Sequence, residues 1–353
     1  MVEKVRPIDL GKPWAFIEPR DKVEDVKLWE EIEALGLPQK VFDVHVHAGL
    51  KQHVEDISVS RLASNKALNN RQWYHLSRIK GLHRIIFFQR EVEFAVFPMP
   101  FSETNVIKAN KYLLKNVTPG EYVISLGNPD EDNLTIQTIE ANREKIVGVK
   151  MYPDQKISSN LVNPDELSIF DFFPKDILTY LNDIELPIIL HLPRKGGLTN
   201  PETFEEVVEL ASMFSKIRII LAHMGRCYNP NLIGRTIEGI EPFQNILFES
   251  SMVDNEDVFE NILRIVGHKR VMFGSDLPFS LVRFLRVLSG DKQEVLSKQE
   301  SYAITIDEKP NISIGMNVLY MTRALLLACR KIGFSEKAIQ EIFNENAKKI
   351  LNI

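Results

Sequence analysis

Short apolar runs rich in β-branched residues recur along the chain, and most of them end in a turn-forming or polar residue. Unbroken apolar runs are typical of parallel strands covered on both faces, whereas half-exposed strands alternate apolar and polar residues. There are eight such runs: VFDVHVH from residue 41, EFAVF from 93, YVISLG from 122, IVGVKMY from 146, PIILHL from 187, IRIILAH from 217, NILFES from 245 and RVMFGSD from 270.

Segments with helical spacing lie between these runs. Some have plausible amino-terminal caps, such as Ser102 with Asn105 following, and Asn200 before Pro201. Eight strands that alternate with helices predict an α/β fold, and specifically a closed (β/α)8 TIM barrel. The clearest predicted helices span residues 102–117, 133–145, 176–184 and 201–214.

Three parts of the chain depart from this regular alternation. Residues 48–92 are too long for one connection and contain a helical stretch at 71–88, so we expect an insertion after strand 1. Residues 278–353 hold a polar stretch between helices. Residues 1–40 include an amphipathic segment at 23–37 and predict a helical amino-terminal extension, which leaves 41–353 as the barrel.

Composition and charge exclude several classes of protein. The chain has 353 residues, 44% of them hydrophobic, with a net charge of −5 and a pI near 6.0, which argues against nucleic-acid binding. No apolar run is long enough to cross a membrane, and the first residues lack a signal-peptide core, so we expect a cytoplasmic protein. The two cysteines have no CxxC partner, so a bound metal would need His and carboxylate ligands.

Two histidines in the first predicted strand provide the first candidate chemistry. Side chains alternate along a strand, so His45 and His47 share one face, which we expect to be the barrel interior. Val44 and Val46 are then expected to face the helices. Two imidazoles on one strand can converge on one ion, and neutral imidazole suits zinc and similar metals. Asp43 is a candidate partner for one of these imidazoles, or simply a charge at the strand entrance.

Other ionisable residues lie at the ends of later predicted strands: Lys150, His191, His223 and Asp276. The carboxyl ends of the strands form the rim where barrel enzymes build their active sites. Each residue alone has a structural explanation, such as a satisfied core histidine or a turn-forming aspartate. Burying all of them together without a metal would carry a large cost in free energy. The sequence therefore predicts a metal site at the barrel mouth.

This order of residues, with the blocks FDVHVHAG, ILHLPR, ILAHMGR and FGSDLPF, resembles the amidohydrolase superfamily. Over residues 41–280 it is most similar to the amidohydrolase-related (amidohydrolase 2) branch, which also contains decarboxylases of the aminocarboxymuconate semialdehyde type. The resemblance implies that His45, His47, His191 and Asp276 bind a divalent metal, most often zinc, with manganese as an alternative. His223 would be a further ligand or a base, and His223 or Asp276 would take the proton from a metal-activated water.

Lys150 leaves the number of metal ions open. Its block GVKMYP resembles the corresponding strand of dihydroorotases, in which a carboxylated lysine bridges two metals. An unmodified ammonium would instead bind an anionic substrate or polarise a carbonyl group. We favour the unmodified lysine and a single ion, with two ions expected if Lys150 is carboxylated.

Two arginines follow the site histidines at matching offsets. Arg194 and Arg226 each lie three residues after a histidine, and with Tyr152 they would form a cationic mouth suited to a substrate carboxylate. The alternative is that each arginine pairs with an acidic loop residue such as Asp154 or Glu249. Glu249 would then satisfy an arginine and not contact substrate.

The leading hypothesis is a metal-dependent hydrolase that cleaves an ester, lactone or amide bond of a small, carboxylate-bearing substrate. A first alternative is a metal-dependent, non-oxidative decarboxylase of an aromatic or unsaturated carboxylic acid. A second is an inactive barrel that acts as a binding protein. We expect a small anionic molecule as the partner, with the extension and the insertion as contacts for a homo-oligomer.

Overall fold

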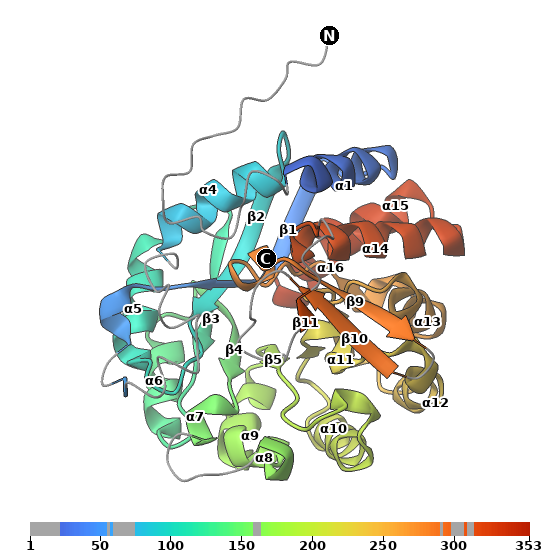
Figure 1. The fold of residues 1–353 in the computed structure, drawn as a ribbon. Coiled ribbons are helices and arrows are strands. Elements are labelled where there is room, and N and C mark those ends of the chain that lie inside the picture. Colours follow the sequence, from blue (N-terminus) through green and yellow to red (C-terminus); the bar gives the residue numbers. More distant parts are fainter. Residues whose placement is uncertain are drawn as a thin grey trace.

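A computed structural model of the chain describes residues 22–54, 57–58, 75–157, 164–289, 292–297, 307–308 and 314–353. Eight parallel strands follow one another in chain order around a barrel that helices surround (Figure 1). The predicted (β/α)8 architecture is therefore confirmed. The strands are β1 Lys40–Ala48, β2 Glu91–Pro98, β3 Glu121–Leu126, β4 Ile146–Met151, β5 Ile188–Leu190, β6 Ile219–Leu221, β7 Ile246–Glu249 and β8 Val271–Met272.

Closure of the barrel depends on the residues that follow β8. The Val44 amide donates to the Phe273 carbonyl at 3.0 Å, and the Asp276 amide donates to the His45 carbonyl at 2.8 Å. An isolated parallel bridge also joins Val46 to Leu277. These bonds align the segment after β8 with the end of β1, so residues 232 positions apart in sequence, such as Asp43 and Ser275, lie in contact.

In the described segments α1 precedes β1, and the other α-helices lie between the strands and after β8. Asn105 caps α5 by accepting from the Lys108 amide at 3.1 Å, so the cap is Asn105 and not Ser102. Asn200 caps α10 as predicted, with Pro201 as its first residue. The helices are α1 Lys22–Ala34, α4 Leu76–Ile86, α5 Val106–Asn116, α6 Asp132–Glu140, α7 Asp154–Ile157, α8 Ile169–Phe172, α9 Lys175–Asp183, α10 Pro201–Met213, α11 His223–Arg226, α12 Pro230–Ile240, α13 Glu256–Val266, α14 Asn317–Ile332, α15 Glu336–Gln340 and α16 Asn346–Leu351.

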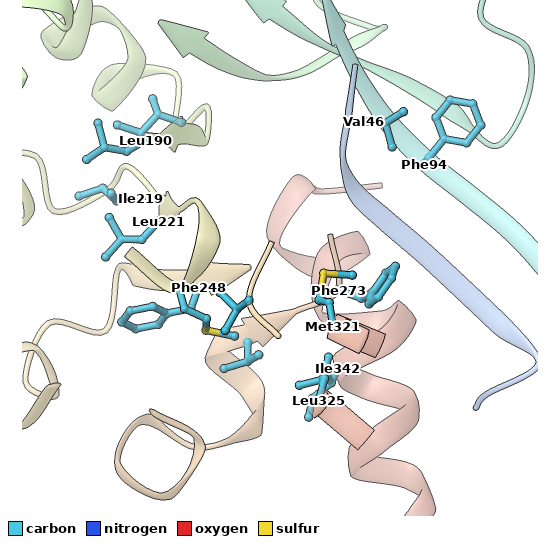
Figure 2. Close-up of a cluster of buried hydrophobic side chains, with 14 of the residues drawn as sticks. Val46, Phe94, Leu190, Ile219, Leu221, Phe248, Phe273, Met321, Leu325 and Ile342 are labelled. Carbon is cyan, nitrogen blue, oxygen red and sulfur yellow. The ribbon is translucent and has the colours of Figure 1, made fainter. Parts of the chain in front are cut away.

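Two clusters of buried apolar side chains make up the core. The larger lies between the strands and the surrounding helices, and Figure 2 shows part of it, with Leu221 and Phe248 from adjacent strands and Met321 from α14. The smaller fills the barrel with residues from all eight of its strands. It comprises Phe42, Val44, Ala95, Phe97, Ile124, Val147, Ile189, Ile220, Ala222, Leu247, Met272, Ala347, Ile350 and Leu351, the last three from α16.

A bulge in β1 corrects the predicted facing of its side chains. Val44 belongs to the interior cluster, so the expectation that it faces the helices is wrong, whereas Val46 does belong to the outer cluster. The pairing with β2 shifts between Asp43 and Val46, where one extra residue stands in β1. Such a bulge reverses the alternation of side chains beyond it. Both Val44 and His45 can therefore point into the barrel.

The segments outside the regular barrel are partly described. The predicted amino-terminal helix is present as α1, which packs on α14. After β8 the chain forms two antiparallel strands, β9 Phe284–Ser289 and β10 Lys292–Ser297, and β10 lies within the polar stretch identified between helices. The insertion after strand 1 contains α4, and Trp73, which belongs to the predicted helical stretch at 71–88, lies outside the described residues. No helix in the described ranges is long and apolar enough to span a membrane.

Candidate metal centre

Three predicted ligands converge where the ends of β1 and β8 meet. His47 Nε2 lies 3.1 Å from Asp276 Oδ1, and His45 Nε2 lies 3.4 Å from the same oxygen. All three side chains are buried. Their ligand atoms lie within 4.8 Å of one another, close enough to share one ion.

The hydrogen-bond partners of the imidazoles assign their tautomers. His45 Nδ1 lies 3.1 Å from Glu249 Oε1, and His47 Nδ1 lies 3.4 Å from the Pro98 carbonyl oxygen. A carboxylate or carbonyl oxygen only accepts, so each Nδ1 carries the proton. The lone pairs on Nε2 of both rings are then directed at Asp276, as in metal sites where a neighbouring oxygen fixes the ring.

The chemistry of these atoms fits a cation. Two imidazole lone pairs and a carboxylate oxygen are all acceptors, and Asp276 Oδ1 has no hydrogen-bond partner among the described residues. A buried polar atom without a partner destabilises a fold by roughly 1–3 kcal/mol. A divalent ion bound by His and carboxylate ligands would satisfy all three atoms. His45, His47 and Asp276 therefore fit the metal that the sequence predicts.

Burial determines the protonation of these groups. It lowers the pKa of His45 and His47 well below 6.5, with the Lys150 charge acting in the same direction, so both imidazoles stay neutral near pH 7. Burial also raises the pKa of the Asp276 carboxyl to about 7. Lys150, whose ammonium lies 3.1 Å from His45 Nε2, has its pKa lowered by burial to about 7. Burial thus favours the neutral form of each of these four side chains.

His223 is presented by a left-handed turn. All four residues of α11 have positive φ, from +52° at Met224 to +65° at Gly225. This conformation is unfavourable for residues other than glycine, by roughly 1–2 kcal/mol each. The turn directs the His223 ring toward His45, with the ring centres 5.1 Å apart. Backbone strain of this kind is concentrated at functional sites.

His191 lies beside this turn and not within the group formed by His45, His47 and Asp276. Its ring centre is 5.2 Å from that of His223 and 4.8 Å from that of Tyr152. Burial lowers its pKa well below 6.5, and its Nδ1 has no hydrogen-bond partner among the described residues. His191 and Tyr152 are thus adjacent to the centre, and their predicted roles remain predictions.

The two arginines differ in what they bind. Arg194 forms two hydrogen bonds of 2.9 Å with Glu206, and a further contact with Glu202, so its charge is already compensated. Its placement does not support the prediction that it binds substrate. Arg226 donates through Nη1 to the carbonyls of Leu192, Pro193 and Arg194, and its Nη2 and Nε have no hydrogen-bond partner among the described residues.

Glu249 is the residue whose role the sequence did not reveal. It contacts neither arginine, and its carboxylate instead binds the His45 imidazole and the His223 backbone amide. The expected imidazole partner, Asp43, accepts from His83 of α4 at 2.9 Å and from the Ser275 amide at 2.8 Å. The sequence does hold one signal that could have identified Glu249 as a site residue. It stands at the end of a strand, as the other site residues do.

Gly274 explains why Glu249 and His45 can meet. A Cβ at this position would lie 2.3 Å from Glu249 Oε2 and 2.9 Å from His45 Cβ. Contacts this short do not occur, so the glycine in the FGSD block provides the space for the imidazole–carboxylate pair.

Comparison with known proteins identifies the family. A sequence model described as amidohydrolase matches residues 118–353, which is more than half of the chain. The chain belongs to the amidohydrolase family. No curated protein sequence matches it significantly. Among amidohydrolase-like structures, a zinc-bound amidohydrolase from Burkholderia multivorans is 12% identical with a TM-score of 0.55, over 89% of this chain and 99% of that one.

Two further structures share the fold. The 5-carboxyvanillate decarboxylase from Sphingomonas paucimobilis is 12% identical, with a TM-score of 0.57 over 90% of this chain and 100% of the other. The 4-oxalomesaconate hydratase from Rhodopseudomonas palustris is 16% identical, with a TM-score of 0.55 over 88% and 95%. Proteins with this barrel fold thus carry out different reactions, and the reaction of this chain must be argued from its own site.

Proposed function

We propose that this amidohydrolase is a metal-dependent hydrolase that cleaves an ester, lactone or amide bond of a small, carboxylate-bearing molecule. The observation that carries the proposal is the convergence of His45 Nε2, His47 Nε2 and the unpartnered Asp276 Oδ1. The zinc in the similar Burkholderia multivorans structure is consistent with this choice of metal. A bound divalent ion would lower the pKa of a water ligand and make it a nucleophile near neutral pH.

His223 is suited to accept a proton in this reaction. Its Nδ1 lies 3.2 Å from the Ser251 carbonyl oxygen, so the proton resides on Nδ1 and the lone pair on Nε2. Burial lowers its pKa to about 4, so the ring is neutral at pH 7. A neutral imidazole with a lone pair on Nε2 can act as a general base.

Arg226 is the proposed binding group for the substrate carboxylate. Its Nη1 is held by three backbone carbonyls, which orients the fork while leaving the charge without a carboxylate partner in the described ranges. A guanidinium binds carboxylates bidentately. Two of the similar structures are named for carboxylate-bearing molecules, which favours the same substrate class here.

The test is a screen of the zinc-loaded protein against small esters, lactones and amides of di- and tricarboxylic acids. In ¹⁸O-labelled water, hydrolysis incorporates the label into the product, whereas decarboxylation releases carbon dioxide and consumes no water. Label in the product supports the hydrolase. Carbon dioxide released from a carboxylic acid, without hydrolysis of any compound, would replace it with the decarboxylase alternative.

A matched pair of variants tests the substrate class. Arg226→Ala should raise KM by roughly 10–100-fold, the equivalent of one charge-assisted interaction. Arg194→Ala should change KM much less, because Glu206 already binds that guanidinium. Equal KM values for Arg226→Ala and the wild type would exclude Arg226 as the carboxylate-binding group.

A further inference from the structure

Glu249, the last residue of β7, is a fully buried carboxylate at the centre of the site. Its Oε1 accepts from His45 Nδ1 at 3.1 Å, from the His223 amide at 2.5 Å and from Ser251 Oγ at 2.8 Å. Its Oε2 accepts from the Ser251 amide at 2.9 Å. One side chain therefore contacts the end of β1, the left-handed turn after β6 and the loop after β7.

Ser251 extends this network to a second imidazole. Its hydroxyl has one hydrogen, which it donates to Glu249, so its lone pairs are left to accept from His223 Nδ1 at 2.7 Å. Glu249 thus fixes the His45 ring directly and the His223 ring through Ser251. In both rings the proton is held on Nδ1 and the lone pair is on Nε2, which in His45 faces the Lys150 ammonium at 3.1 Å.

The same carboxylate also supports the strained backbone. The His223 amide, which begins the run of positive φ angles, donates to Glu249 Oε1. Arg226, at the other end of this run, is held by the carbonyls of residues 192–194. An acceptor at one end and a donor at the other keep the turn in the conformation that presents His223.

We propose that Glu249 is a positioning residue which, with Ser251, sets the tautomer and direction of two imidazoles so that both present Nε2 to the metal centre. This inference rests on the proposed metal-dependent function. Glu249 Oε1 and the nitrogens of His45 and His223 also lie close enough together to share an ion, so the test must separate a positioning role from direct ligation.

The test compares three variants that retain the barrel. Glu249→Gln removes the charge and one acceptor at constant shape, and Ser251→Ala removes the hydroxyl that links Glu249 to His223 and lies 3.4 Å from His45 Nδ1. Ser250→Ala is the matched control, because Ser250 is equally buried but its hydroxyl bonds only the Gly274 backbone among the described residues. Zinc affinity is measured by competition with a chelator, after circular dichroism has shown that each variant is folded.

Loss of a group that orients a metal ligand typically weakens binding 10–100-fold. We expect this loss in Glu249→Gln, a smaller one in Ser251→Ala, and less than threefold in Ser250→Ala. At saturating cobalt(II), the absorption bands of Glu249→Gln should match the wild type, since no ligand has been removed. Zinc affinity within threefold of wild type in Glu249→Gln, or shifted cobalt bands, would overturn the proposal.

A readout on the metal-free chain separates this inference from the proposed function. Nitrogen-15 spectra of histidine-labelled protein distinguish the two neutral tautomers, and His45 and His223 should both hold the proton on Nδ1 in the wild type. Glu249→Gln should shift both signals toward the other tautomer. If the wild type binds no zinc, the proposed function fails, while these spectra still decide the role of Glu249.

Discussion

The ion pair between Asp25 of α1 and Arg283 after β8 gives a sharp test of how the amino-terminal helix is attached. Arg283 Nη2 lies 2.6 Å from Asp25 Oδ2, and Nη1 lies 3.1 Å from Oδ1. Arg283 is 1% exposed and Asp25 is 9% exposed. Asp25 Oδ1 also accepts from the Met316 amide at 3.0 Å. The pair thus joins α1 to the segments on both sides of the β9–β10 hairpin.

Asp25→Ala should lower the free energy of unfolding by about 3–5 kcal/mol, the usual effect of removing one partner of a buried ion pair. Glu33 on the same helix is the control. It pairs with Arg90 at 2.6 Å, but its side chain is 46% exposed, so Glu33→Ala should lower the free energy of unfolding by about 1 kcal/mol or less.

Urea denaturation followed by circular dichroism measures both variants under the same conditions. Asp25→Leu combined with Arg283→Met should recover part of the loss, because an apolar pair replaces the buried ion pair. If Asp25→Ala and Glu33→Ala destabilised the protein equally, the Asp25–Arg283 ion pair would not be the contact that attaches α1 to the barrel. A much larger loss of stability in Asp25→Ala than in Glu33→Ala would show that α1 unfolds cooperatively with the barrel, whereas the sequence predicted a separate extension.

Three further predictions concern the site and the thiols. Gly274→Ala should weaken zinc binding at least tenfold in a chelator competition, because its Cβ would displace Glu249; unchanged affinity would contradict that. Burial raises the pKa of the Asp276 carboxyl from 3.8 to about 7. The free energy of unfolding of the metal-free protein therefore has its full contribution from the neutral carboxyl below about pH 4, and this contribution is lost as the pH rises to 7. Asp276→Asn should therefore stabilise the metal-free protein, by at most about 4 kcal/mol at pH 8 and by less at pH 5, and equal urea midpoints at pH 8 would refute this. Cys227 and Cys329 are buried with pKa raised to about 12, so a thiol reagent should modify them only after unfolding, and rapid labelling of native protein would contradict their burial.

The barrel was predictable from the sequence because its strands are buried on both faces. The run PIILHL, for example, contains strand β5, and eight such runs in chain order leave few other arrangements. The direction of side chains in β1 was not predictable. It depends on one extra residue between Asp43 and Val46, and nothing in the residue types there indicates a bulge.

The candidate site was predictable to the level of residue types at strand ends. His45, His47 and Asp276 do converge, because the alignment of the segment after β8 with β1 brings them together. The partners of the charged groups were not predictable. Arg194 binds Glu206 of α10, and that contact depends on how a helix packs against a loop. Neither the spacing nor the residue type of Arg194 contains that information.

The most direct test of the central claim is a crystal structure of the zinc-loaded protein, with the ion located by anomalous scattering. We expect one ion bound by His45 Nε2, His47 Nε2 and Asp276, with Glu249 bonded to His45 and not to the ion. An ion elsewhere, or no ion after soaking in zinc, would contradict the claim that these three residues form the metal centre.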